Sequence, residues 1–254
     1  MKQAELAEAF ATLHVPGDPL VLFNIWDAGS AQAVVKAGAK AVATGSWSVA
    51  GAHGYPDGES IPLDLLLRIA ARITESVDVP LTVDFEGGYA VEAEPLAENI
   101  GSLIGAGAIG LNFEDQIVGG EGLHPIDLQV SRIKAIRAAA DAKGVKLFIN
   151  ARTDLFLKER DPAAHAGLMD AAIERAAAYA EAGASGFFAP ALVTPALIER
   201  LCHAASLPVN IMALPGAPDR AALASVGVAR ISHGPGPWRA MQSWLREAAA
   251  AAMA

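Results

Sequence analysis

The hydrophobic positions of this chain fall into short runs that alternate with longer helical segments. Four times, a helical stretch ends in an Ala-Gly-Ala or similar step and an apolar run follows, at residues 36–43, 105–112, 181–188 and, more loosely, 225–232. A glycine at such a step suits the left-handed residue that ends many helices, and a short, often β-branched run suits a buried parallel strand. The pattern predicts a series of βα units.

Eight strands are expected when the remaining apolar runs are included. They are Val21–Ala28, Ala41–Ser46, Leu81–Glu86, Gly110–Asp115, Leu147–Arg152, Gly186–Ala189, Val209–Ala213 and Ala229–His233. The clearest helices between them are Leu63–Val77, Asp127–Ala142, Leu168–Ala182 and Pro195–Ala204, with Asp127 and Thr194 as expected N-caps. Eight alternations predict an α/β fold, a (β/α)8 or TIM barrel, with residues 1–254 as a single domain. A doubly wound open sheet is the alternative, but no glycine-rich phosphate-binding motif follows the first strand.

Composition narrows the functional classes. Hydrophobic residues make up 53% of the chain, so a large core is available, and the formal charge is -9 with no basic cluster. Nucleic acids and anionic membrane surfaces are therefore not expected as partners. No apolar run approaches the roughly 18 residues of a membrane span. The single Cys202 excludes an internal disulfide and indicates a small buried hydrophobe. We expect a cytoplasmic protein.

The stretch from Pro80 to Tyr89 carries the first indication of chemistry. Its apolar residues alternate with Thr82, Asp84 and Glu86, so both carboxylates are expected on one face of a strand end. Two carboxylates on one face repel each other unless a positive charge lies between them, and a hard divalent cation takes oxygen ligands. A solvated acidic strand end is the alternative interpretation.

In a barrel, polar residues at the carboxyl ends of strands converge on one mouth. The expected set is Asn24, Asp27, Thr44, Ser46, Trp47, Asp84, Glu86, Glu114, Asp115, Asn150, Arg152, Asn210, Ser232 and His233. Within it Asp84, Glu86 and Glu114, with Asp57 from the loop above, form an acidic cluster that suits Mg²⁺ or Mn²⁺. No His or Cys cluster has the spacing of a zinc site.

Arg152 is the only cationic side chain expected at this rim. A guanidinium opposite a metal suits the carboxylate of a small oxoacid substrate. A structural ion pair with Glu114 or Asp154 is the alternative.

Other mouth residues admit two interpretations each. Asn24 and Asn210 either contact substrate or hold strand ends by hydrogen bonds, and Trp47 is either a pocket wall or a core aromatic. His233 is a candidate general acid or base, although a hydrogen-bonded structural role is favoured. His53 and His124 lie in loops and are expected to be solvated.

Two long glycine-containing loops, 47–60 and 116–125, follow expected strand ends on the same face. Loops in this position act as lids in many barrel enzymes. Simple loop mobility is the alternative.

Several motifs make the chain resemble the isocitrate lyase/phosphoenolpyruvate mutase superfamily over almost its whole length, from Asn24 to about Met241. The motifs span 24–31 (NIWDAGSA), 54–59 (GYPDGE), 83–89 (VDFEGGY), 112–116 (NFEDQ), 150–154 (NARTD) and 175–183 (RAAAYAEAG). The resemblance implies a modified barrel whose last helix swaps between subunits of a homodimer or homotetramer, and the Ala-rich segment 244–254 is a candidate for that helix.

The resemblance also implies a site. Mg²⁺ would be bound by Asp84, with Asp57, Glu86 and Glu114 around it, mostly through water. The backbone near Ser46 and Trp47, together with Arg152, would hold the 2-oxo acid end of a small carboxylate substrate. Superfamily reactions make or break a C–C or P–C bond next to a 2-oxo carboxylate through a metal-stabilised enolate.

One loop departs from the superfamily pattern. Lyase members carry a Lys-Arg-Cys-Gly-His type motif after the fourth strand, and mutase and phosphonopyruvate hydrolase members use a Lys and an Asn or Thr there. Here residues 116–125 read QIVGGEGLHP, with no Cys, Lys or Arg. The resulting hypothesis is an Mg²⁺-dependent lyase that decarboxylates oxaloacetate or performs a retro-aldol cleavage, with His233, His124 or metal-bound water as proton source. Hydrolysis of a C–C or P–C bond, a phosphonomutase, and a non-enzymatic 2-oxo acid-binding protein are the alternatives.

Overall fold

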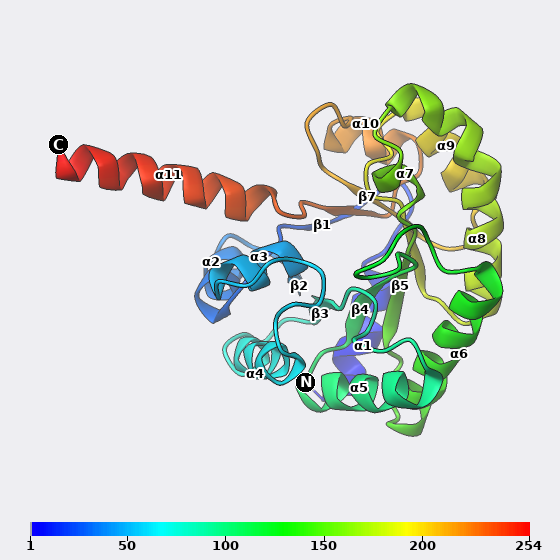
Figure 1. Cartoon of the computed structure of the whole chain (residues 1–254), viewed down its shortest axis with the longest axis horizontal. Helices are drawn as coiled ribbons and strands as arrows, with labels where there is room; N and C mark the ends of the chain where they lie inside the picture. The colour runs from blue at the N-terminus through cyan, green and yellow to red at the C-terminus, as the bar shows by residue number, and fades with distance from the viewer. Residues whose placement is uncertain (1) are drawn as a thin grey trace.

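Eight short parallel strands form the centre of the structure, a computed structural model that describes residues 2–254 (Figure 1). They are β1 (Leu20–Leu22), β2 (Val42–Ala43), β3 (Leu81–Asp84), β4 (Gly110–Glu114), β5 (Phe148–Arg152), β6 (Gly186–Phe188), β7 (Val209–Met212) and β8 (Arg230–Ser232). The strand order is β1-β8-β7-β6-β5-β4-β3-β2. A parallel bridge between Ile25 and Thr44 joins the first strand to the second and closes the ring. The predicted (β/α)8 barrel is confirmed.

Helices connect the strands and cover the outside of the barrel (Figure 1). Those that lead from one strand to the next include α2 (Ala28–Lys36), α4 (Leu63–Thr74), α5 (Ala93–Gly105), α6 (Ile126–Ala142), α8 (Met169–Glu181), α9 (Pro195–Ala204) and the short α10 (Arg220–Ser225). The four helices predicted from the sequence are found with their ends within about three residues of the expected positions. The predicted junction glycines Gly38, Gly107, Gly183 and Gly227 all have a positive φ. Each therefore ends its helix in the left-handed conformation that glycine adopts without strain.

Some element boundaries differ from the prediction. The first strand ends at Leu22 and not at Ala28, and Asp27 caps α2, its Oδ1 accepting the backbone N–H of Ser30 at 2.7 Å. Asp127 lies inside the first turn of α6, which begins at Ile126, so its expected role as N-cap is wrong. Thr194 does precede α9, but its side chain makes no capping hydrogen bond. The loop after β2 begins with a short helix, α3 (Ser46–Ala52), which the sequence did not predict.

Alternate residues of each strand face opposite sides, which separates an apolar layer from a polar one. Outward-facing side chains such as Leu111, Phe113 and Ile149 are fully buried between the strands and the helices. The inward side carries Asn112, Asn150, Asn210 and Arg230, all of them buried as well. Much of the apolar core therefore lies between the strands and the helices, while the barrel interior contains a layer of buried polar side chains.

The two terminal helices behave differently. Helix α1 (Gln3–Thr12) packs against the barrel: Phe10 meets Phe148 edge to face, and Gln3 donates hydrogen bonds to two backbone carbonyls near β4. Helix α11 (Gly236–Met253) projects away from the barrel as a lone helix (Figure 1). Within residues 2–254, no helix combines the length and apolar character needed to cross a membrane.

Candidate active site

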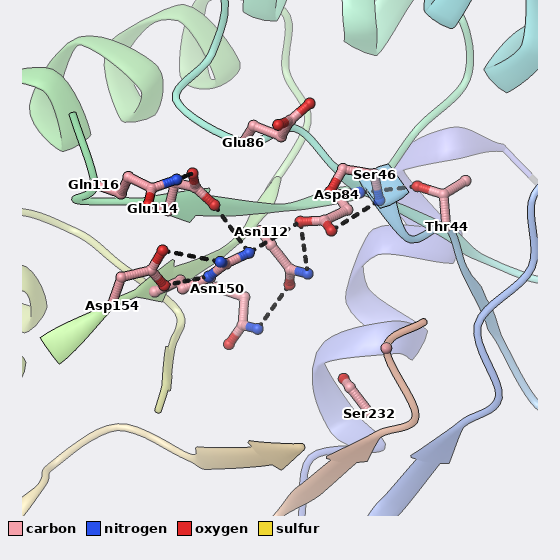
Figure 2. A network of polar contacts seen from close by, with 12 residues as sticks. Thr44, Ser46, Asp84, Glu86, Asn112, Glu114, Gln116, Asn150, Asp154 and Ser232 are labelled. Atoms are coloured by element: carbon pink, nitrogen blue, oxygen red, sulfur yellow. Dashed lines mark hydrogen bonds and ion pairs between the residues drawn. The ribbon is translucent and has the colours of Figure 1, made fainter. Parts of the chain in front are cut away.

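Asp84 ends strand β3 and is held in place by its neighbours (Figure 2). Its Oδ2 accepts the backbone N–H of Ser46 at 3.0 Å, and its Oδ1 accepts a hydrogen bond from Asn112 Nδ2 at 3.3 Å. Its own N–H donates to Thr44 Oγ1 at 2.9 Å. The start of α3 and strand β4 thus fix the Asp84 carboxylate at the barrel mouth, where it lines a cavity of about 490 Å³.

Arg152 ends strand β5 and reaches toward Asp84 from the other side of β4. Its Nη1 lies 2.9 Å from Glu114 Oε2 and 4.0 Å from Asp84 Oδ1. Its Nε and Nη2 donate to the two carboxylate oxygens of Asp154 at 2.6 and 2.9 Å. The structural ion pair considered as an alternative is therefore present, with both expected partners. A guanidinium has five N–H groups, so two remain for a ligand in the cavity that Arg152 lines.

Glu86 does not lie where the sequence placed it. Strand β3 ends at Asp84, and Glu86 has a positive φ of 49°, so the strand alternation that would put both carboxylates on one face has already ended. Its carboxylate instead accepts the backbone N–H groups of Gly58 and Glu59 at 2.9–3.0 Å. Glu86 is thereby tied to the loop that carries Asp57, apart from the hydrogen-bonded network of Figure 2.

Asp57, Ser46 and Trp47 line the cavity, as expected. Glu114 is buried behind the wall, where Gln116 Nε2 donates to it at 3.0 Å. It reaches the cavity only through its ion pair with Arg152.

Asn24, Asn210 and His233 do not line the cavity. Asn24 bridges the Thr44 carbonyl and the Gly234 N–H, and Asn210 hydrogen-bonds Ser232, so both hold strand ends. The β8 residue that lines the cavity is Ser232, and the next residue, His233, lies against Phe23 with a ring-centroid distance of 5.0 Å. Of the expected loop histidines, His124 is buried rather than solvated, and it is also outside the cavity.

The expectation that Arg152 is the only cation at the rim is wrong. Lys158, Arg160 and Arg239 also line the cavity, and all three side chains are exposed. Arg239 extends from α11 over the ring of Trp47, with its guanidinium carbon 4.7 Å from the ring centroid. No ion pair involves these three cations within the described residues 2–254.

Ionisation is suppressed in two carboxyl groups on the acidic side of the site. Burial, together with the nearby carboxylates of Asp57 and Asp84, raises the pKa of Glu86 to about 9. Burial also raises the pKa of Glu114, with Arg152 opposing the shift. Carboxylates whose ionisation is suppressed in this way are stabilised in their charged form by an added cation.

The donor set fits a hydrated Mg²⁺ and does not fit a metal that needs several protein ligands. In the part of the chain that the structure describes, no three His, Cys, Asp or Glu side chains converge closely enough to hold a metal ion together. Mg²⁺ usually keeps several waters and binds through one or two carboxylates, which suits Asp84 with Asp57 on the same cavity wall. Zinc sites instead require three or four side-chain ligands.

Sequence reasoning did not select Asn112, Gln116, Asp154, Lys158, Arg160 or Arg239 as site residues. The first three could have been predicted, because they belong to the strand-end motifs 112–116 and 150–154. The three rim cations gave no signal, since Lys158 and Arg160 lie beyond a short helix, α7 (Leu155–Lys158), and Arg239 lies at the start of α11. A larger groove of about 740 Å³ lies outside the barrel against β1 and α2, away from this chemistry.

The fold and the strand-end site define a barrel of the mutase and lyase type, and comparison with known proteins agrees. Residues 10–253 match the family model for phosphoenolpyruvate phosphomutase, so the chain belongs to that family. It is 34% identical to the uncharacterized protein Rv1998c of Mycobacterium tuberculosis over 91% of this chain and 84% of that protein. It is 36% identical to 2-methylisocitrate lyase of Escherichia coli K12 over 78% of this chain and 70% of the enzyme.

A solved structure is more similar still. A crystal structure from Burkholderia cenocepacia J2315, provisionally described as a phosphonomutase, is 48% identical with a TM-score of 0.92. The match covers 96% of this chain and 97% of that one. The superfamily contains enzymes that cleave C–C or P–C bonds, including lyases, hydrolases and mutases.

Proposed function

We propose that this protein is an Mg²⁺-dependent lyase that breaks a carbon–carbon bond in a small 2-oxo acid or in its hydroxy-acid adduct, through a metal-stabilised enolate. Decarboxylation of oxaloacetate and retro-aldol cleavage of a hydroxy-acid adduct are its two forms. The observation that carries this proposal is the approach of Arg152 Nη1 to within 4.0 Å of Asp84 Oδ1 at the barrel mouth. A carboxylate suited to a hydrated cation and a guanidinium suited to a substrate carboxylate thus share one cavity wall.

Each part of the substrate has a group to bind it. The two remaining N–H groups of Arg152 would hold the carboxylate next to the 2-oxo group, beside the start of α3 at Ser46 and Trp47. Asp84 would hold Mg²⁺, with Asp57 on the same wall, and the bound ion supplies a Lewis acid for the 2-oxo group. Glu86 would keep the loop containing Asp57 in place through Gly58 and Glu59.

The rim cations favour a second anionic group on the substrate. Lys158, Arg160 and Arg239 face the cavity from outside the barrel and have no carboxylate partner among residues 2–254. Unpaired cations around a cleft concentrate anionic ligands there and raise the association rate. A dicarboxylate such as oxaloacetate would place its first carboxylate on Arg152 and direct its second toward this rim.

The absence of Cys, Lys and Arg from the loop 116–125 favours decarboxylation over reactions that need an acid at the departing group. The loop folds back on itself, with an antiparallel bridge between Gln116 and Leu123, and only Gln116 lines the cavity. When oxaloacetate loses CO₂, the electron pair of the broken bond moves onto the 2-oxo group, so the departing carbon needs no proton. A proton from solvent, which reaches the exposed rim, then completes pyruvate.

A substrate panel tests the proposal. Purified metal-free protein is incubated with and without Mg²⁺ and with oxaloacetate, 2-methylisocitrate, 2,3-dimethylmalate or phosphonopyruvate, and pyruvate, CO₂ and phosphate are measured. Mg²⁺-dependent pyruvate release from a C–C substrate is expected. Phosphate release from phosphonopyruvate would indicate a hydrolase instead, and its conversion to phosphoenolpyruvate a mutase. Tight 2-oxo acid binding without turnover by any substrate would indicate a binding protein.

The resemblance to the superfamily and the projecting helix α11 together support a homodimer or homotetramer. Apart from Pro237, no residue of α11 is buried within this chain. In its first turn Trp238 packs on Trp26 and Arg239 lies over Trp47, but the rest of this 18-residue amphipathic helix is not buried by residues 2–254. Because an isolated helix is only marginally stable in water, we propose that α11 packs on a second subunit.

A further inference from the structure

Arg230 is a cation sealed inside the barrel beneath the cavity. It points inward from β8 and is 0% exposed. Its Nε donates to Ser232 Oγ at 3.2 Å, and its Nη2 donates to Asn112 Oδ1 at 3.2 Å. In the strand order β8 and β4 are four strands apart, so the side chain of Arg230 crosses the barrel interior to reach Asn112.

The environment of Arg230 is costly for a charged group. No carboxylate lies within ion-pairing distance of it in residues 2–254, and its Nη1 has no hydrogen-bond partner there. Burial lowers the pKa of Arg230 to about 9, and Asp84 is the carboxylate that opposes the shift. Because replacing buried charges with apolar side chains often stabilises a fold, stability alone does not explain this arginine.

Asn112 connects Arg230 to Asp84. In the sheet register Asn112 lies between Asp84 on β3 and Asn150 on β5. Its Oδ1 accepts two hydrogen bonds, from Arg230 Nη2 at 3.2 Å and from Asn150 Nδ2 at 2.8 Å, and its Nδ2 donates to Asp84 Oδ1 at 3.3 Å (Figure 2 shows the links to Asn150 and Asp84).

The chemistry of arginine determines which way the Asn112 amide points. A guanidinium can only donate hydrogen bonds, so the atom of Asn112 that faces Arg230 must be the carbonyl oxygen. The amide nitrogen must then face Asp84, where it donates to the carboxylate. With an apolar residue at position 230, the amide would lose its charged donor and the main reason for this orientation.

The adjacent glycine leaves room for this arrangement. Gly186 pairs with Asn150 in the register of β5 and β6. A Cβ at position 186 would lie 3.0 Å from Asn150 Oδ1 and 3.0–3.1 Å from the Phe148 ring. A larger residue would therefore displace Asn150, which supplies the second donor to Asn112.

We propose that Arg230 is a positioning residue that, through Asn112, orients the Asp84 carboxylate for Mg²⁺. It touches neither metal nor substrate. The inference rests on the proposed function, because it concerns how Asp84 binds the cation. Removing a group that orients a metal ligand without touching the metal typically lowers metal affinity or activity 10–100-fold.

The test measures Mg²⁺ binding to metal-free, full-length protein by titration calorimetry, together with the melting temperature. We expect Arg230→Met to weaken Mg²⁺ binding about tenfold or more without lowering the melting temperature. Arg230→Lys keeps a charge and a donor and should recover part of the affinity. Arg137→Met is the matched control: Arg137 donates to the carbonyls of Gly183 and Leu147 at part-buried positions, so its loss should lower the melting temperature and leave Mg²⁺ affinity unchanged.

Two further variants separate the possible failures. Asn112→Leu should weaken Mg²⁺ binding, and adding Arg230→Met to it should cause little further loss, because both act on Asp84 by one route. If folded Arg230→Met binds Mg²⁺ within about twofold of the wild type, the role of Arg230 is overturned while the metal site stands. If Arg230→Met does not fold, the Asn112→Leu variant serves in its place, and unchanged Mg²⁺ affinity in that variant overturns the proposed role of Arg230. A wild type that binds no Mg²⁺, or Asp84→Ala that binds it normally, overturns the metal site and this inference together.

Discussion

Asp154 holds the guanidinium of Arg152 through two hydrogen bonds of 2.6 and 2.9 Å, one to each carboxylate oxygen. The Asp154 carboxylate is itself buried, and its backbone N–H donates to Asp115 at 3.0 Å. A bidentate pair of this kind fixes the plane of the guanidinium as well as its position. Arg152 therefore presents its remaining N–H groups to the cavity in one orientation.

This relationship predicts that Asp154→Asn impairs catalysis without removing either the metal site or the substrate clamp. The amide cannot accept both N–H groups, so Arg152 loses its fixed orientation, and we expect kcat/KM to fall about 10–100-fold, the range seen when a supporting group is removed. Steady-state kinetics on the substrate identified by the panel measures the loss. Asp170→Asn, which removes an exposed ion pair with Arg200, is the control and should have no effect. Equal kinetics in both variants would contradict an orienting role for Asp154.

Asp84 is predicted to be indispensable for metal binding. Asp84→Ala removes the carboxylate that Ser46 and Asn112 orient, so Mg²⁺ binding and activity should both be lost while the far-ultraviolet circular dichroism stays unchanged. Titration calorimetry with MgCl₂ makes the measurement. Asp64→Ala, at an exposed position of α4, is the matched control and should bind Mg²⁺ normally. Retained Mg²⁺ affinity in Asp84→Ala would contradict the proposed Mg²⁺ site.

The Glu86 carboxylate predicts a pH dependence of stability in the metal-free protein. Its pKa is raised from 4.5 to about 9 in the folded state, chiefly by burial. The unfolded chain releases this proton near pH 4.5, whereas the folded protein keeps it until about pH 9. The stabilisation of the fold by this proton is therefore complete below pH 4.5 and is lost as the pH rises toward 9. One proton corresponds to about 1.4 kcal/mol of unfolding free energy per pH unit, and each kcal/mol to about 2–4 °C in Tm.

Thermal melts of metal-free protein between pH 6 and pH 9 test this dependence. The wild-type Tm should fall with pH more steeply than that of Glu86→Gln, which cannot ionise. Mg²⁺ should raise the wild-type Tm more at pH 9 than at pH 6, because it stabilises the ionised carboxylates. Glu121→Gln, at an exposed position of the loop after β4, should melt like the wild type. Parallel slopes for the wild type and Glu86→Gln would exclude Glu86 as the source.

Helix α11 predicts an assembly that depends on its apolar side chains. Trp244 is 66% exposed and Leu245 is 48% exposed on a helix that projects from the barrel. Contiguous exposed apolar residues of this kind mark interaction surfaces, and tryptophan is enriched among the residues that contribute most of the binding energy. We expect a dimer or tetramer for the wild type and a smaller species for Trp244→Glu, measured by light scattering after size exclusion.

The control for this prediction is Arg246→Glu, which introduces the same residue two positions away on α11. Because Arg246 is a polar, exposed position, the assembly should persist in that variant. A monomeric wild type, or an unchanged mass in Trp244→Glu, would refute the proposed packing of α11.

Most of the architecture could be deduced from the amino-acid sequence alone. Helix, glycine and strand recur in a fixed order, and both the helix period and the left-handed conformation of Gly38, Gly107, Gly183 and Gly227 depend on local interactions. The positions of Asp84 and Arg152 followed from the same logic, because the carboxyl ends of parallel strands meet at one mouth.

The direction of individual side chains at the barrel mouth depends on the tertiary structure. Where a strand stops decides which face its next residue takes, so Glu86 turned to the loop at Gly58, and His233 lay against Phe23 outside the cavity. Lys158, Arg160 and Arg239 reached one rim only because the barrel brings the segment after β5 beside the start of α11. Arg230 met Asn112 across the barrel, 118 residues away in the chain. Such encounters depend on closure of the ring, which no local pattern of residues encodes.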